Sequence, residues 1–181
     1  RYKIASDAYK SVDWLGAQSG KPAEYVGGRS GNFVEMVFEQ RVRQLRDDGN
    51  AVLEITIEAL KYRGLIEDRT VLDFDSGRPA DANNPLAKLI GKSYGLAMSP
   101  KGKVVELLEM DSVRQAVSSG SPAFGVAARL VSDEAVRERH EIPPLLALQE
   151  GQARVGQKWS EVKSVAFGLV GRQGVERVCT L

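Results

Sequence analysis

Apolar and polar residues alternate along two neighbouring segments, which span residues 34–45 and 51–60. This period of two is typical of β-strands with one buried face and one solvated face. The linking residues, Asp47 to Asn50, include a glycine and an asparagine that accept the positive φ of a tight turn. The pattern therefore predicts an antiparallel hairpin with one apolar face. Its apolar positions are Val34, Met36, Phe38 and Val42 on the first strand and Leu53, Ile55, Ile57 and Ala59 on the second.

The N-terminal part of the chain is predicted to form a short strand followed by a flexible loop. Residues 1–10 place Tyr2 and Ile4 on one side, as a strand does. Residues 11–32 are rich in Gly, Ser and Lys and are interpreted as the loop. Residues 27–31 superficially resemble a phosphate-binding loop, but they lack the Gly-Lys-Ser/Thr ending and no helical pattern follows them.

The middle of the chain is predicted to hold a short helix and more strands. Asn84 is a good N-cap, Pro85 suits the first helical position, and Gly91 provides a stop. The later strands are expected to turn at Ser99 to Gly102. The predicted strands cover residues 62–74, 94–98 and 104–108.

The C-terminal part is predicted to be helical in parts over residues 122–141 and to end in a hairpin. Ser132 is the expected N-cap of a helix that reaches His140, and Asp111 is the expected cap of an earlier one. The hairpin is formed by residues 162–170 and 175–181. Because the last strand ends without a turn, we expect a domain truncated at its C-terminus or a strand that a partner completes.

These elements define an α+β fold class. We expect a strongly curved, half-barrel-like antiparallel sheet with a few short helices packed on it, because helices are an economical cover for a one-sided sheet. Residues 1–181 suit one domain.

Composition excludes several classes of function. Apolar residues make up 43% of the chain, which suffices for a packed core, and the formal net charge is only +1. There is no overall field to attract nucleic acid, and no apolar run is long enough to span a membrane. Arg41, Arg43 and Arg46 lie near Glu35 and Glu39, which favours a solvated sheet face over a nucleic-acid platform.

Single cysteine and histidine residues limit the available chemistry. Cys179 is the only cysteine, so no internal disulfide forms, and we expect it to be a small buried side chain. His140 is the only histidine and ends a charged helix, so we predict a solvated surface residue and neither a catalytic triad nor a zinc site. No cofactor is predicted.

Acidic residues offer the remaining candidate chemistry. Asp73, Asp75 and Asp81 could share a calcium ion, although they lack the full ligand series. Hydrogen bonding of such side chains to their own backbone is the alternative. A hydrolase that uses Asp73, Asp75 and Glu106 is a further hypothesis.

Four blocks together resemble a known family over about residues 33–165. The family comprises uncharacterised exported bacterial proteins with a domain of unknown function and often a lipoprotein-type leader. The resemblance implies an extracytoplasmic location, in the periplasm or cell envelope, and no activity. The chain as it stands shows no leader or lipid-attachment cysteine, so a lipid anchor is not visible. The blocks are Asp48-Gly49 with 52–57, Phe74-Asp75-Ser76, 89–92 with 96–104, and 155–159.

We therefore expect a non-catalytic exported domain that acts through protein–protein contacts, as an accessory or structural subunit of an envelope or secreted assembly. The alternative is a carrier or sensor of an apolar, lipid-like molecule held between sheet and helices. Its candidate lining also reads as ordinary core, and consists of Met36, Phe38, Leu53, Ile55, Ile57, Tyr94, Leu96 and Met98.

Overall fold

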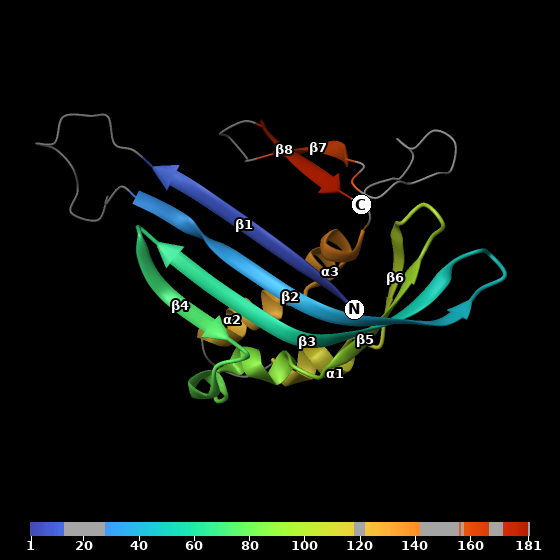
Figure 1. The fold of residues 1–181 in the computed structure, drawn as a ribbon, viewed down its shortest axis with the longest axis horizontal. Coiled ribbons are helices and arrows are strands. Elements are labelled where there is room, and N and C mark those ends of the chain that lie inside the picture. The colour runs from blue at the N-terminus through green and yellow to red at the C-terminus, as the bar shows by residue number, and fades with distance from the viewer. Residues whose placement is uncertain (13–27, 118–121, 142–155, 157, 167–171, 181) are drawn as a thin grey trace, which may run out of the picture.

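The computed structural model describes residues 1–12, 28–117, 122–141, 156, 158–166 and 172–180. Within them lies a six-stranded antiparallel sheet with short helices, which confirms the predicted α+β class (Figure 1). The sheet is open and does not close into a barrel. Its strands are β1 (Tyr2–Val12), β2 (Gly28–Leu45), β3 (Ala51–Ile66), β4 (Arg69–Asp75), β5 (Ser93–Met98) and β6 (Val104–Leu108).

Strand β3 is the centre of this sheet. One of its edges pairs with β2 along nearly its whole length, and its other edge is divided between β5 and β4. The order is β1-β2-β3-β5-β6, with β4 beside the second half of β3. Irregular registers at four places, including Val37/Phe38 and Val42/Gln44, bend these long strands. A separate hairpin is formed by β7 (Lys158–Ala166) and β8 (Arg172–Thr180).

Short helices gather on one face of the sheet (Figure 1). We call this the inner face, and the opposite one the outer face. The core forms where apolar side chains of β2, β3 and β5 meet those of the helices, and Phe38, Ile55 and Leu96 are fully buried there. The helical elements are η2 (Pro79–Asp81), η3 (Pro85–Leu89), α1 (Asp111–Ala116), α2 (Pro122–Leu130) and α3 (Asp133–His140).

Local signals placed several turns and helix starts correctly. The side chain of Asn84 accepts a hydrogen bond from Leu86 N, and that of Ser132 accepts one from Ala135 N. Gly49 and Gly91 take the positive φ values of 82° and 76° that their turns need. The predicted helix after Asn84 is a 3₁₀ helix, and Asp111 lies in the first turn of α1 without capping it.

The predicted loop over residues 11–32 is wrong at both ends, because β1 continues to Val12 and β2 begins at Gly28. Residues 13–27 lie outside the described residues. Gly31 explains part of the error: a Cβ atom there would lie 2.0 Å from the carbonyl oxygen of Ala8. The glycine permits a close approach of β1 and β2, so it belongs to a strand pair here and does not interrupt one.

Charged side chains cover the outer face, as the sequence predicted. Arg43 pairs with Glu54 at 2.6 Å and with Glu109 at 3.0 Å, and Arg46 pairs with Glu106 at 2.9 Å. These arginines near the end of β2 reach carboxylates on or just after β6, because the outer positions of β5 that lie between them carry small side chains. Those positions are Ser93, Gly95 and Ala97.

Two leucines provide a test of the inner face. Leu96 is fully buried, whereas Leu45, at the projecting end of β2, is 73% exposed. We expect Leu96→Ala to lower the free energy of unfolding by about 2–5 kcal/mol, because it leaves a cavity. The same change at Leu45 is expected to cost under about 0.5 kcal/mol. Urea denaturation of both variants measures the difference, and equal losses would contradict the assigned core.

Candidate binding edge on strand β1

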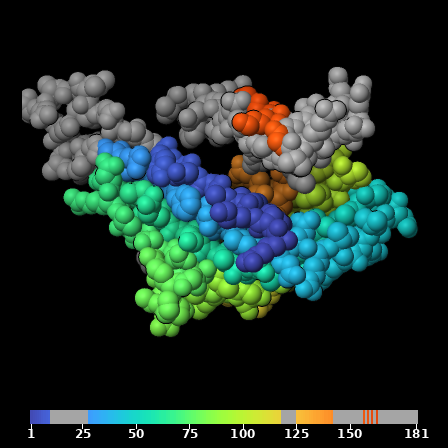
Figure 2. Space-filling model, viewed as in Figure 1, coloured from blue at the N-terminus to red at the C-terminus, as the bar shows by residue number. Residues whose placement is uncertain are grey.

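Strand β1 forms one edge of the sheet and is open to solvent. It pairs with β2 through residues Tyr2 to Val12 without a register shift. Among the described residues, no strand pairs with its other edge. Residues 5–9 are all exposed, and Figure 2 shows β1 in dark blue as a continuous band across the surface. An extended, unpaired edge of this kind is a template for another strand.

The hydrogen bonds of one residue on β2 and one on β3 determine which way the β1 backbone groups point. Arg29 donates its N–H to Asp68 Oδ2 and accepts from Asp68 N, so its backbone groups point away from β1. Leu60, which opposes Met36, exchanges bonds with Ser76 on the far side of β3. The backbone N–H and C=O groups of successive residues point to opposite sides of a strand. The even-numbered residues of β2, such as Met36, therefore bond to β1.

The register of β1 against β2 then decides which backbone groups of β1 point away from β2. Even-numbered β1 residues oppose even-numbered β2 residues, as Ile4 opposes Met36 and Ser6 opposes Val34. These residues are therefore bonded to β2. The N–H and C=O groups of the odd-numbered residues point outward from the sheet. The outward residues are Lys3, Ala5, Asp7 and Tyr9.

At each of two other edges of the same sheet, one of the protein's own side chains bonds to a backbone group. At the β4 edge, Asp81 Oδ2 accepts a hydrogen bond from Asp75 N at 2.8 Å. At the β6 edge, Arg137 Nη1 donates to the carbonyl oxygen of Val104 at 2.5 Å. Within the described part of the chain, no side chain bonds to the outward groups of β1, and β1 contains no proline or bulge. It therefore lacks two of the devices that keep edges from pairing, while Lys3 and Asp7 place charged side chains along it.

A buried histidine anchors the start of β1. The hydroxyl of Tyr2 lies 2.7 Å from His140 Nδ1, and the hydroxyl of Tyr94 on β5 lies 2.6 Å from His140 Nε2. A neutral imidazole has one N–H and one lone pair, so one tyrosine donates and the other accepts. The ring of Phe38 packs edge-on against the imidazole at 5.1 Å. The edge strand is thereby tied to α3 and to the core.

The prediction of a solvated surface histidine is wrong, because His140 is only 5% exposed. Burial, assisted by the charge of Arg139, lowers the pKa of His140 to about 3. Burial also raises the pKa of Tyr94 to about 12 and that of Tyr2 further, so both hydroxyls keep their protons. The sequence signal for this site was the position of His140 one helical turn after Val136, on the buried face of α3.

Alternating charges cross the outer face and end at the β1 edge. Asp75 Oδ2 lies 3.0 Å from Lys61 Nζ, and Lys61 opposes Glu35 on β2. Glu35 Oε2 lies 3.2 Å from Lys3 Nζ, whose side chain is 58% exposed. The row therefore reads negative, positive, negative, positive from β4 to β1, and it stops at a lysine that faces solvent.

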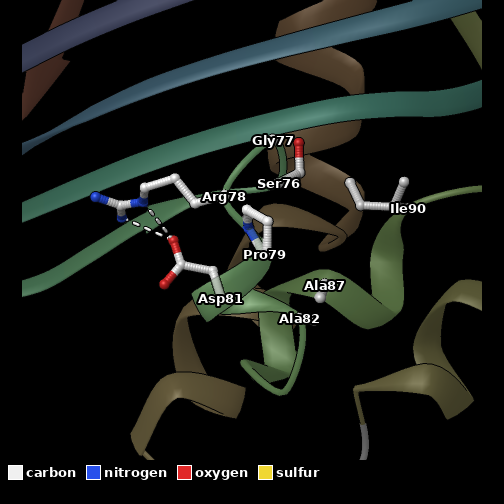
Figure 3. Close-up of a pocket in the computed structure, with 8 residues that line it drawn as sticks. All are labelled: Ser76, Gly77, Arg78, Pro79, Asp81, Ala82, Ala87 and Ile90. Carbon is white, nitrogen blue, oxygen red and sulfur yellow. Dashed lines mark hydrogen bonds and ion pairs between the residues drawn. The ribbon is translucent and has the colours of Figure 1, made fainter.

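The candidate apolar lining belongs to the core. All eight side chains pack in one cluster with residues of η3, α1, α2 and α3, and Met98 alone lies at its margin. Two surface pockets of the described structure have other walls. One of them, of about 350 Å³, lies beside Arg78 and the loop that leads into η3 (Figure 3).

The acidic residues near that pocket are already paired. Arg78 bonds to Asp81 at 2.7 Å (Figure 3) and to Asp73 at 3.1 Å. Asp75 accepts from Gly77 N and contacts Lys61. The backbone N–H of Gly77, then Lys61, lowers the pKa of Asp75. These carboxylates hold the loop in place. Across the described ranges, no group of three His, Cys, Asp or Glu side chains is arranged to hold a metal ion.

Glu106 does not join Asp73 and Asp75. Asp73 opposes Arg63 near one end of β3, whereas Glu106 on β6 lies in the row of Val52 near the other end. That separation along β3 is about 35 Å. The three carboxylates of the hydrolase hypothesis therefore do not form one site.

Cys179 belongs to β8, and its side chain lies outside the described residues.

No protein-family model, no curated protein and no solved structure matches this chain. The resemblance to exported bacterial proteins and the extracytoplasmic location stay predictions. In the part of the chain that the structure describes, no helix has the length and apolarity to cross a membrane.

His140 predicts a pH dependence of stability. Its folded pKa is below the ordinary value of 6.5. Above about pH 6.5 the ring is neutral in both states. Between about pH 6.5 and about pH 3 the unfolded chain binds a proton that the folded chain does not. The free energy of unfolding therefore falls by up to about 1.4 kcal/mol for each unit by which the pH is lowered.

The matched variant is His140→Gln, which keeps a donor and an acceptor but does not titrate. Urea denaturation from pH 7 to pH 4 should show a shallower loss of stability for His140→Gln than for the wild type. Equal slopes would exclude a buried neutral histidine in the folded protein.

Proposed function

We propose that this protein is a non-catalytic binding domain that adds an extended segment of another protein chain to the free edge of β1. The observation that carries the proposal is the contrast between edges. Asp81 and Arg137 each bond a backbone group of the β4 and β6 edges, whereas no side chain in the described residues bonds to the outward groups of the exposed β1 strand. Strand addition uses such groups for affinity and alternate side chains for specificity.

The anchoring of β1 supports the same role. The bond from Tyr2 to His140 and the ladder with β2 hold the strand extended before a partner arrives. A preformed edge loses little conformational entropy on binding, which favours association. Because the candidate apolar lining is packed as core, no specific observation favours a lipid carrier over a protein-binding domain. A role in an envelope or secreted assembly is part of the proposal and rests on the resemblance.

Two proline substitutions distinguish the two edges of β1. Ala5→Pro removes an outward N–H, and we expect the free energy of unfolding to change by less than about 1 kcal/mol. Ser6→Pro removes an N–H that bonds to β2, and we expect a loss of about 1–3 kcal/mol. Urea denaturation measures both. A larger loss for Ala5→Pro than for Ser6→Pro would reverse the assigned directions.

Binding is tested by a photo-reactive phenylalanine analogue placed at Tyr9, next to the edge, in the cell that produces the protein. We expect a discrete cross-linked protein product that disappears when Ala5→Pro is added. The control places the analogue at Leu45, which is 73% exposed but distant from β1. A product that survives Ala5→Pro, or no product at position 9, counts against strand addition.

A further inference from the structure

We infer that a second copy of this chain occupies the β1 edge, so that two β1 strands pair antiparallel and the two sheets become continuous. This inference rests on the proposed function and names the partner. A two-fold axis through Ala5, perpendicular to the sheet, places Lys3 of each copy opposite Asp7 of the other. The interface is thereby self-complementary in charge, as a two-fold contact requires.

The backbone geometry permits this register. Lys3, Ala5 and Asp7 all carry outward N–H and C=O groups, so pairs made among them are hydrogen-bonded pairs. They also share the outer face with Glu35, because their even-numbered neighbours Tyr2 and Ile4 turn toward the core. Opposed Lys3 and Asp7 side chains would therefore lie on the same face, at the spacing of direct cross-strand neighbours.

Neighbouring registers lose this match. A shift of two residues brings Lys3 opposite Tyr9 and Asp7 opposite Ala5, and a further shift of two sets the two Asp7 side chains against each other. A shift in the other direction pairs Asp7 with Arg1, but Arg1 precedes β1, which begins at Tyr2, and Lys3 then opposes Ala5. Like charges directly opposite each other are destabilising, so the charges select the register centred on Ala5.

The same register extends the row of charges on the outer face. Within one copy the row runs Asp75, Lys61, Glu35, Lys3, and its last member faces solvent. Asp7 of the second copy would lie beyond Lys3 and continue the alternation of sign. Asp7 is exposed on its own sheet. The contact is small and polar at its rim, so we expect a weak, concentration-dependent dimer.

Charge reversal with mixing tests the inference. Sedimentation velocity of the purified 19.7 kDa chain should show mass approaching twice that value as concentration rises. Lys3→Asp and Asp7→Lys each create two like-charge pairs, and each should weaken dimerisation at least about tenfold. An equimolar mixture of the two variants restores both opposite-charge pairs and should form a mixed dimer.

Matched variants complete the test. Asp47→Lys makes the same charge change in the exposed β2–β3 turn and should dimerise as the wild type does. Ala5→Pro should abolish the dimer. A wild type that stays monomeric, a mixture that does not associate, or a dimer that survives Ala5→Pro would each overturn the inference. If the wild type is monomeric while the analogue at Tyr9 captures a different protein, the proposed function stands and only the second copy is rejected.

Discussion

Exclusion of water from one face of the sheet is the constraint on which the rest of the structure depends. The inner side chains of β2, β3 and β5 are buried against short helices, while the outer face carries pairs such as Arg43 with Glu54. The helices are too short to form a stable layer by themselves, so their order comes from this contact. Helices laid on a face leave the edges of a sheet uncovered, and each edge needs its own solution.

A single polar cluster connects the core to the edge. His140 is neutral and buried, and its two nitrogens meet hydroxyls from β1 and β5. A buried imidazole with only one partner would leave a polar atom unsatisfied, which costs more than a satisfied pair contributes. The cluster is therefore complete only when α3, β1 and β5 are all in place. Packing of the helix and placement of the edge strand are thereby linked.

The three edges of the sheet differ in whether the protein's own side chains bond to their backbone groups. The β4 and β6 edges receive side chains from the protein's own η2 and α3 segments, while the β1 edge presents exposed groups in an unbroken ladder. Open edges favour association, and proteins usually blunt them. The row of outer-face charges from Asp75 to Lys3 ends in a cation at this open edge. The proposed strand addition and the proposed pairing of two β1 strands both use the outward backbone groups of this edge.

By itself the sequence determined the alternating strands, the turn at Gly49, and the helix starts at Asn84 and Ser132, because each depends on neighbouring residues and local geometry. Only the tertiary structure decided the burial of His140, the pairing of Gly31 with β1, and the role of Met36 and Leu96 as packed core. These outcomes depend on segments far apart in the chain, such as Tyr2 and His140. Local periodicity shows which face is apolar, but the pairing of strands decides what covers that face and which edge stays open.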